Sequence, residues 1–163
     1  EFRIMFKVID NYLKLDEHLD LKSIMESDEF SWFYNPEKVI GDRGLFKSQF
    51  VHIFYKDNIV NSKFFNYLNP IIKKLKTLSL IHIKANLNPI SHKLIKFGKH
   101  ADQSFKCKAA LYYLNDNNGY TMIGKNKVES KSNRIVLFDA NQDHYGTNST
   151  NCNNRIVINF NYF

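Results

Sequence analysis

The second half of the chain is a series of short strand-like runs, and this pattern constrains the fold more than any other feature. From Ile81 to Leu87, apolar and polar residues alternate as in a strand with one buried face. Clusters of Asn, Asp, Gly and Ser separate the later runs. We expect strands at 81–87, 93–97, 106–114, 120–123, 134–139 and 155–163. Such a series predicts a sandwich or a barrel with helices outside it.

The first half of the chain mixes strands with helices. We expect strands at 6–13, 31–34 and 50–55, and a short helix capped by Asp20. A second helix begins near Ser62, where apolar residues recur at helical spacing. Pro70 removes a backbone donor from this helix, which predicts either a kink or a new helix with Asn69 as its cap.

Length and composition are those of one globular domain. A chain of 163 residues with 44% apolar residues can bury about 70% of its unfolded surface. No stretch approaches the ~20 apolar residues of a membrane span, and Glu1 to Ile9 lacks the features of a signal peptide. Cys107 and Cys152 form neither a disulfide framework nor a zinc-ribbon spacing. We expect no membrane association and a cytoplasmic location, in the host cytoplasm if the chain is viral.

The formal charge of +7 raises the question of nucleic acid as a partner, because a basic field attracts polyanions. The 23 Lys and Arg are scattered along the chain. The densest group is Lys73, Lys74 and Lys76, at the C-terminal end of a predicted helix. Cations at that end interact favourably with the helix dipole. Nucleic acid therefore stays an alternative partner that is not favoured. The oligomeric state is not indicated by any pattern in the sequence.

Three residues could hold a metal ion. In an extended strand the side chains of His100 and Asp102 point to the same face, so they could coordinate one ion together. His18 and Asp20 have the same spacing, but we interpret them as solvated residues at the start of a helix. We expect His144 in a loop after the strand 134–139. It would complete the two-histidine, one-carboxylate triad of non-haem Fe(II) oxygenases. Such a triad leaves the other coordination positions of the metal open. Taken alone, His144 is better interpreted as an ordinary loop histidine.

The last strand has two different faces. One is apolar, with Ile156, Ile158, Phe160 and Tyr162, and the other carries Arg155, Val157, Asn159 and Asn161. The second face either meets solvent or lines a polar interior. In an interior, Arg155 could bind a carboxylate with its two-pronged guanidinium, for example the distal carboxylate of 2-oxoglutarate.

The order and spacing of these sequence motifs resemble those of the prolyl-hydroxylase branch of the Fe(II)- and 2-oxoglutarate-dependent oxygenases. The whole chain is similar to small uncharacterised members from phages and marine microbes. The resemblance rests on His100-Ala101-Asp102, the segments 109–115 (AALYYLN) and 118–121 (NGYT), the distal His144, and Arg155 eleven residues after it.

The resemblance implies a mainly β fold with flanking helices, the double-stranded β-helix, which is a jelly-roll or cupin-like barrel. Residues 1–163 would form a single oxygenase domain in which 78–163 are the β-helix core and 1–77 support it. The implied catalytic and metal-binding residues are His100, Asp102 and His144, and the implied co-substrate-binding residues are Arg155, Tyr113, Thr121 and Asn159. The implied cofactors are Fe(II), 2-oxoglutarate and O2.

The implied activity is hydroxylation of an unidentified substrate, with succinate and CO2 as co-products. A peptidyl proline or another protein side chain is the first substrate class, and a free amino acid or small metabolite is the next. The alternative is a catalytically inactive barrel that serves as a binding module, with nucleic acid among its candidate ligands.

Overall fold

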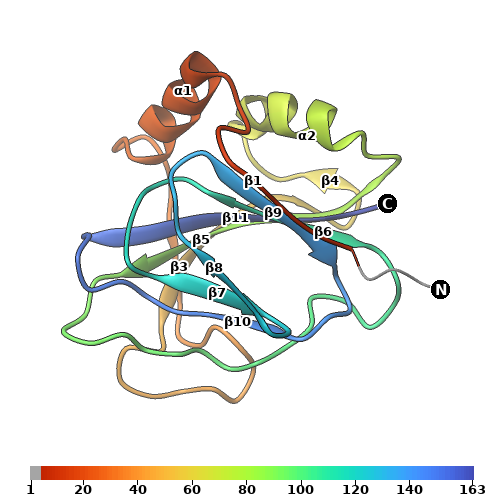
Figure 1. Cartoon of the computed structure of the whole chain (residues 1–163). Coiled ribbons are helices and arrows are strands. Elements are labelled where there is room, and N and C mark those ends of the chain that lie inside the picture. The colour runs from red at the N-terminus through yellow and green to blue at the C-terminus, as the bar shows by residue number, and fades with distance from the viewer. Residues whose placement is uncertain (1–4) are drawn as a thin grey trace.

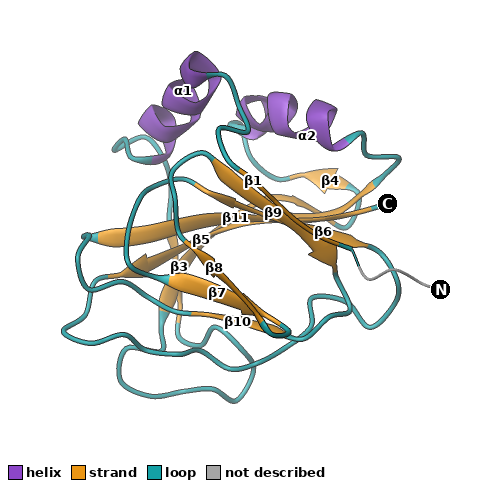
Figure 2. Cartoon of the chain, viewed as in Figure 1, coloured by secondary structure: helices purple, strands orange, loops and turns teal. Residues whose placement is uncertain are grey.

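The computed structural model describes residues 5–163, so the first four residues of the segment tested for a signal peptide lie outside the described part. Two antiparallel sheets face each other, and two helices cover the outer side of the larger sheet (Figure 1; Figure 2). The order of the larger sheet is β1 (Phe6–Ile9), β9 (Arg134–Asp139), β6 (Lys108–Tyr113), β11 (Asn154–Tyr162), β5 (Leu80–Pro89), β3 (Gln49–Lys56) and β2 (Phe33–Asn35), with β4 (Ile59–Val60) beside β3. The smaller sheet is β10 (His144–Gly146), β7 (Tyr120–Ile123) and β8 (Asn126–Glu129).

Side-chain alternation along β11 builds two cores, one on each face of the larger sheet. Ile156 and Ile158 pack on the helix side, in the cluster that includes Leu21 of α1 (Leu15–Met25) and Ile71 of α2 (Asn69–Leu75). Val157 belongs to a second cluster between the two sheets. The polar face of the last strand therefore lines an interior rather than solvent, and the expected double-stranded β-helix with flanking helices is confirmed.

The connection between β5 and β6 adds to the edge of the smaller sheet. Lys96 forms an isolated bridge with Thr147, and His100 forms one with His144. The expected strand at 93–97 is wrong, because only Lys96 of that stretch pairs with a neighbour. The expectation that His144 lies in a loop is also wrong, since it is the first residue of β10.

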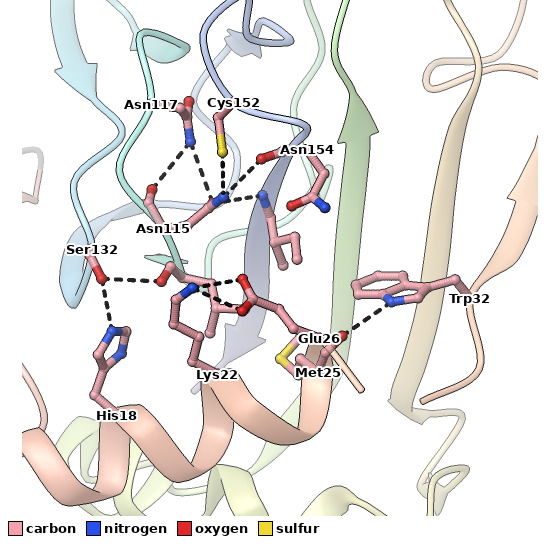
Figure 3. A network of polar contacts seen from close by, with 12 residues as sticks. His18, Lys22, Met25, Glu26, Trp32, Asn115, Asn117, Ser132, Cys152 and Asn154 are labelled. Atoms are coloured by element: carbon pink, nitrogen blue, oxygen red, sulfur yellow. Dashed lines mark hydrogen bonds and ion pairs between the residues drawn. The ribbon is translucent and has the colours of Figure 1, made fainter. Parts of the chain in front are cut away.

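The first helix begins earlier than predicted. Asp20 lies inside α1 and does not cap it. His18 is only 4% exposed, and one ring nitrogen hydrogen-bonds the Tyr112 hydroxyl at 2.7 Å. The other hydrogen-bonds the Ser132 hydroxyl at 2.8 Å (Figure 3). The interpretation of His18 as a solvated residue is therefore wrong, because the earlier helix start turns it toward the sheet.

The second helix region follows one of the two predicted alternatives. A short 3-10 helix, η1 (Phe65–Leu68), precedes α2, and Pro70 lies in the first turn of α2. The cap residue is Leu68 rather than Asn69. Neither this helix nor any other in the described part of the chain is long and apolar enough to cross a membrane.

Candidate functional site

His100, Asp102 and His144 come together at the edge of the smaller sheet. The backbones of His100 and His144 exchange two hydrogen bonds, of 3.0 and 2.8 Å, and the Asp102 amide donates to the Ala140 carbonyl at 3.0 Å. The two imidazole centroids are 4.6 Å apart. Asp102 Oδ1 lies 3.6 Å from His144 Nε2 and 3.9 Å from His100 Nε2. The structure thus brings all three predicted ligands into one cluster.

Backbone carbonyls orient both histidines. His100 Nδ1 lies 3.1 Å from the Gly98 carbonyl, and His144 Nδ1 lies 3.1 Å from the Gln142 carbonyl. A carbonyl only accepts, so each Nδ1 carries the proton and each Nε2 keeps a free lone pair. Burial lowers the pKa of His100, and the neighbouring His144 lowers it further. A lowered pKa favours the neutral imidazole that a metal requires.

Two asparagines of β11 orient the carboxylate. Asn159 Nδ2 and Asn161 Nδ2 both donate to Asp102 Oδ2, each at 3.0 Å. These bonds leave Oδ1 on the side of the histidines. Asn159 lines the cavity, and its predicted contact with the co-substrate stays a prediction. The contact of Asn161 with Asp102 was not expected. Its position on the polar face of the last strand was the available signal.

The geometry of these donors fits one divalent ion. The three candidate ligand atoms lie within 4.8 Å of one another. An ion at about 2.1 Å from each would draw them to about 3 Å apart, which requires only a small inward shift of the side chains. Two imidazoles and one carboxylate leave the remaining coordination positions open, as Fe(II) chemistry with a bidentate acid and dioxygen requires.

Arg155 is a buried cation without an acidic partner in the part of the chain that the structure describes. Its side chain on β11 is 2% exposed, Nε donates to Ser130 Oγ at 2.7 Å, and Nη2 donates to Thr121 Oγ1 at 2.9 Å. Within residues 5–163 it forms no ion pair, and burial lowers its pKa. A buried charge without a counter-charge is costly, so an anion that enters beside Arg155 gains a strong partner. Ser130 as the anchor of Nε was not foreseen from the sequence.

Thr121 links Tyr113 to Arg155. The Tyr113 hydroxyl donates to Thr121 Oγ1 at 2.9 Å, and the same oxygen accepts from Arg155. With its lone pairs engaged, the Thr121 hydroxyl is left to donate its own hydrogen, for example to a carboxylate. Thr121 and Arg155 line the cavity, whereas Tyr113 is fully buried and is not part of the lining. Direct contact of Tyr113 with a bound acid stays a prediction.

One cavity joins the candidate ligands to Arg155. Its volume is about 60 Å³, and its lining also includes Lys38, Gln49, Lys84 and Asn86. Lys38 comes from the connection between β2 and β3. Its Nζ lies 3.5 Å from the position that a Cβ on Gly146 would occupy, and Arg155 Nη1 lies 3.6 Å from the same point. This volume is small for a five-carbon diacid.

A larger cavity, of about 630 Å³, lies on the helix side of the larger sheet beside α1 (Figure 3). Several of its polar side chains already have partners. Lys22 Nζ lies 2.8 Å from Glu26 Oε1, and Trp32 Nε1 donates to the Met25 carbonyl at 3.3 Å. Asn115 Nδ2 donates to the Asn154 carbonyl at 2.8 Å. This cavity contains no metal-ligand cluster and no unpaired arginine, so we place the candidate site on the other face.

Comparison with known proteins relates the chain to solved structures, whereas no family model and no curated protein matches its sequence. A prolyl hydroxylase from Trichoplax adhaerens, in complex with a peptide fragment of the hypoxia inducible factor oxygen degradation domain, is similar with a TM-score of 0.66. The two are 14% identical, and the match covers 96% of this chain and 83% of that one.

Two further structures show the same likeness. An oxidoreductase of the 2OG-Fe(II) oxygenase family from Burkholderia pseudomallei has a TM-score of 0.67 at 10% identity, over 96% of this chain and 84% of that chain. HygX from Streptomyces hygroscopicus, with nickel, 2-oxoglutarate and hygromycin B bound, has a TM-score of 0.64 at 13% identity, over 96% and 82%. The chain therefore has the double-stranded β-helix fold found in the 2-oxoglutarate- and Fe(II)-dependent oxygenases.

Proposed function

We propose that the chain is a non-haem Fe(II)- and 2-oxoglutarate-dependent dioxygenase that hydroxylates its substrate. One observation carries the proposal: an open two-histidine, one-carboxylate cluster shares a cavity with a buried arginine that lacks an acidic partner among the described residues. The likeness in fold to oxygenases adds support. When bound, iron supplies the oxidative decarboxylation of 2-oxoglutarate to succinate and CO2, coupled to hydroxylation of a C–H bond by O2.

In this proposal each residue of the chain has a binding or positioning task. His100 Nε2, His144 Nε2 and Asp102 Oδ1 hold the metal. Arg155 binds the distal carboxylate of 2-oxoglutarate through Nη1, which has no hydrogen-bond partner within the described residues, and the Thr121 hydroxyl donates to the same carboxylate. Holding both ends of the co-substrate fixes its orientation, which is the main contribution that a protein makes to such chemistry.

The substrate class is proposed more broadly than the reaction. Among the similar structures, the prolyl hydroxylase is in complex with a peptide fragment, and HygX is bound to hygromycin B. The same fold thus accommodates both peptides and small molecules. A peptidyl proline, another protein side chain or a small metabolite therefore all remain substrate classes of the proposal.

Turnover of 2-oxoglutarate in the absence of the substrate tests the proposal without knowledge of what the substrate is. The purified chain, supplied with Fe(II), 2-oxoglutarate and air, is expected to form succinate, measured by NMR. The His144→Ala variant is expected to lose this activity because it lacks one metal ligand. His92→Ala is the matched control, since His92 is exposed and outside the cavity. Equal succinate formation by wild type and His144→Ala would refute the proposal.

A further inference from the structure

The part of the cavity lining that lies beside the strand of Arg155 is cationic and has unpaired polar groups. Lys84 and Asn86 lie on β5, Gln49 lies at the start of β3, and Lys38 precedes β3; these four residues are called the cationic wall. Among the described residues, neither lysine forms an ion pair with an acidic side chain. Both lysines have a pKa lowered mainly by burial.

The amides of this wall also lack partners. Gln49 is fully buried, and within residues 5–163 neither its Nε2 nor its Oε1 has a hydrogen-bond partner. Asn86 Oδ1 is buried and unpaired as well. Lys38 Nζ has weak compensation, a contact of 3.4 Å with Asn88 Oδ1 and a position 4.1 Å from the centroid of the Phe97 ring. Buried polar groups are normally hydrogen-bonded, so unpaired groups that line a cavity indicate a ligand that pairs with them.

The charges of the site do not balance with metal and 2-oxoglutarate alone. This step rests on the proposed function. The two positive charges of Fe(II) match the two carboxylates of 2-oxoglutarate, and Arg155 matches Asp102. Among the described residues that line the cavity, no acidic group other than Asp102 is available to match Lys38 and Lys84 in their protonated forms. Because a low-dielectric site disfavours excess charge of one sign, a further anion is favoured there.

The pairing of the strands places Lys84 at the metal end of the cavity, whereas Lys38 Nζ approaches Arg155. In the β11–β5 register, Lys84 lies opposite Asn159, the residue that holds Asp102. Arg155 lies opposite Asn88, four positions further along β5. Four strand residues span about 13 Å, so Lys84 and Arg155 serve different ends of the cavity.

We propose that the cationic wall binds an acidic group of the substrate, a carboxylate or a phosphate, and that the enzyme acts on a small anionic molecule. The ammonium groups of Lys84 and Lys38 pair with the anion, and the amides of Gln49 and Asn86 hydrogen-bond its neighbouring polar atoms. A charge-assisted contact near the metal holds the C–H bond to be hydroxylated in a fixed position. A neutral peptidyl proline would leave both lysines unpaired.

Paramagnetic relaxation tests this proposal directly. The protein is loaded with substoichiometric Mn(II) and saturating 2-oxoglutarate, and anions are added as probes. The relaxation of the phosphorus nucleus of inorganic phosphate and of the methylene protons of malonate is then measured. Enhanced relaxation of either anion, absent with His100→Ala, shows that the anion binds close to the metal, and the two probes distinguish a phosphate site from a carboxylate site.

Substitutions of the two lysines test whether the anion binds to the cationic wall. Lys84→Met is expected to weaken anion binding about tenfold, because it removes one charge-assisted contact. Lys38→Met, on a connection rather than a strand, is expected to act in the same direction and provides a second variant if Lys84→Met does not fold. Lys125→Met is the matched control, since Lys125 is exposed between β7 and β8 and outside the cavity.

The outcomes separate this inference from the proposed function. If 2-oxoglutarate binds but neither anion shows enhanced relaxation, the inference is wrong and the proposed function stands. If Lys84→Met weakens 2-oxoglutarate binding and leaves the anions unaffected, the lysine belongs to the co-substrate site and the inference is again wrong. If 2-oxoglutarate itself does not bind to the Mn(II)-loaded protein, the proposed function fails and the inference fails with it.

Discussion

Asn161 is predicted to control metal affinity although it does not touch the metal. Its side chain is 3% exposed, and it supplies one of the two donors to Asp102 Oδ2, at 3.0 Å. Asn161→Leu keeps the size of the side chain and removes that donor. The carboxylate is then held by Asn159 alone and is free to rotate Oδ1 away from the histidines.

The expected magnitude follows from the charge of the acceptor. A hydrogen bond to a charged group contributes about 1.5–3 kcal/mol. If this contribution is fully coupled to metal binding, the dissociation constant rises about 10- to 100-fold, which agrees with the usual effect of removing a partner of a metal ligand.

Calorimetric titration of the apo protein with Mn(II) measures this change. Asn115→Leu is the matched control, because Asn115 is also buried and its side chain bonds the backbone of Ile156 at 3.1 Å, on the helix side of the sheet. We expect Asn115→Leu to lower the free energy of unfolding and to leave the affinity for Mn(II) unchanged. A folded Asn161→Leu variant with the wild-type dissociation constant would refute the reasoning.

Two further predictions concern Arg155 and the end of β1. A Cβ at Gly119 would lie 2.5 Å from Arg155 Cδ and 2.5 Å from the Asn148 backbone oxygen, so Gly119→Ala is expected to displace both. We expect weaker 2-oxoglutarate binding with little change in Mn(II) affinity, as measured by calorimetry; unchanged 2-oxoglutarate binding would contradict this. Hydrogen bonds from Arg134 and Lys131 lower the pKa of Asp10 to about 2. Asp10→Asn is expected to lower the free energy of unfolding by at most about 1 kcal/mol at neutral pH, because the pair is partly exposed. Because the pKa of Asp10 is lower in the folded protein, its ionised form stabilises the fold at pH values above the unfolded pKa near 3.8. This stabilisation is lost as the pH falls through about 2. The free energies of unfolding of the wild type and Asp10→Asn, measured by denaturant titration, should therefore converge in acid.

The sequence predicts best the strands that are bounded on both sides by turn residues. The strands at 120–123 and 134–139 are confirmed with the bounds expected, because Gly, Asn and Ser clusters flank them. β8 was missed, since its four residues are mostly polar and show no apolar alternation. His144 was expected in a loop because a strand of three residues is too short to produce a period.

The site was harder to predict than the fold because its partners are distant in sequence. Alternation of polar and apolar residues identifies the polar face of a strand, but it does not tell whether that face meets solvent or a cavity. Lys84 and Asn86 in the strand 81–87 were visible as polar positions, yet only the pairing of β5 with β11 shows that they face the site. Lys38 lies in an irregular connection that has no periodic signal, so only the three-dimensional structure connects it with Arg155.

The central claim is that His100, Asp102 and His144 hold one Fe(II) ion while 2-oxoglutarate binds to it and to Arg155. Anaerobic addition of Fe(II) and 2-oxoglutarate tests it through the visible metal-to-ligand charge-transfer absorption that arises when the acid chelates the iron. We predict this absorption for the wild-type protein and its loss in His100→Ala. Its absence in the wild type, or its persistence in His100→Ala, would contradict the account.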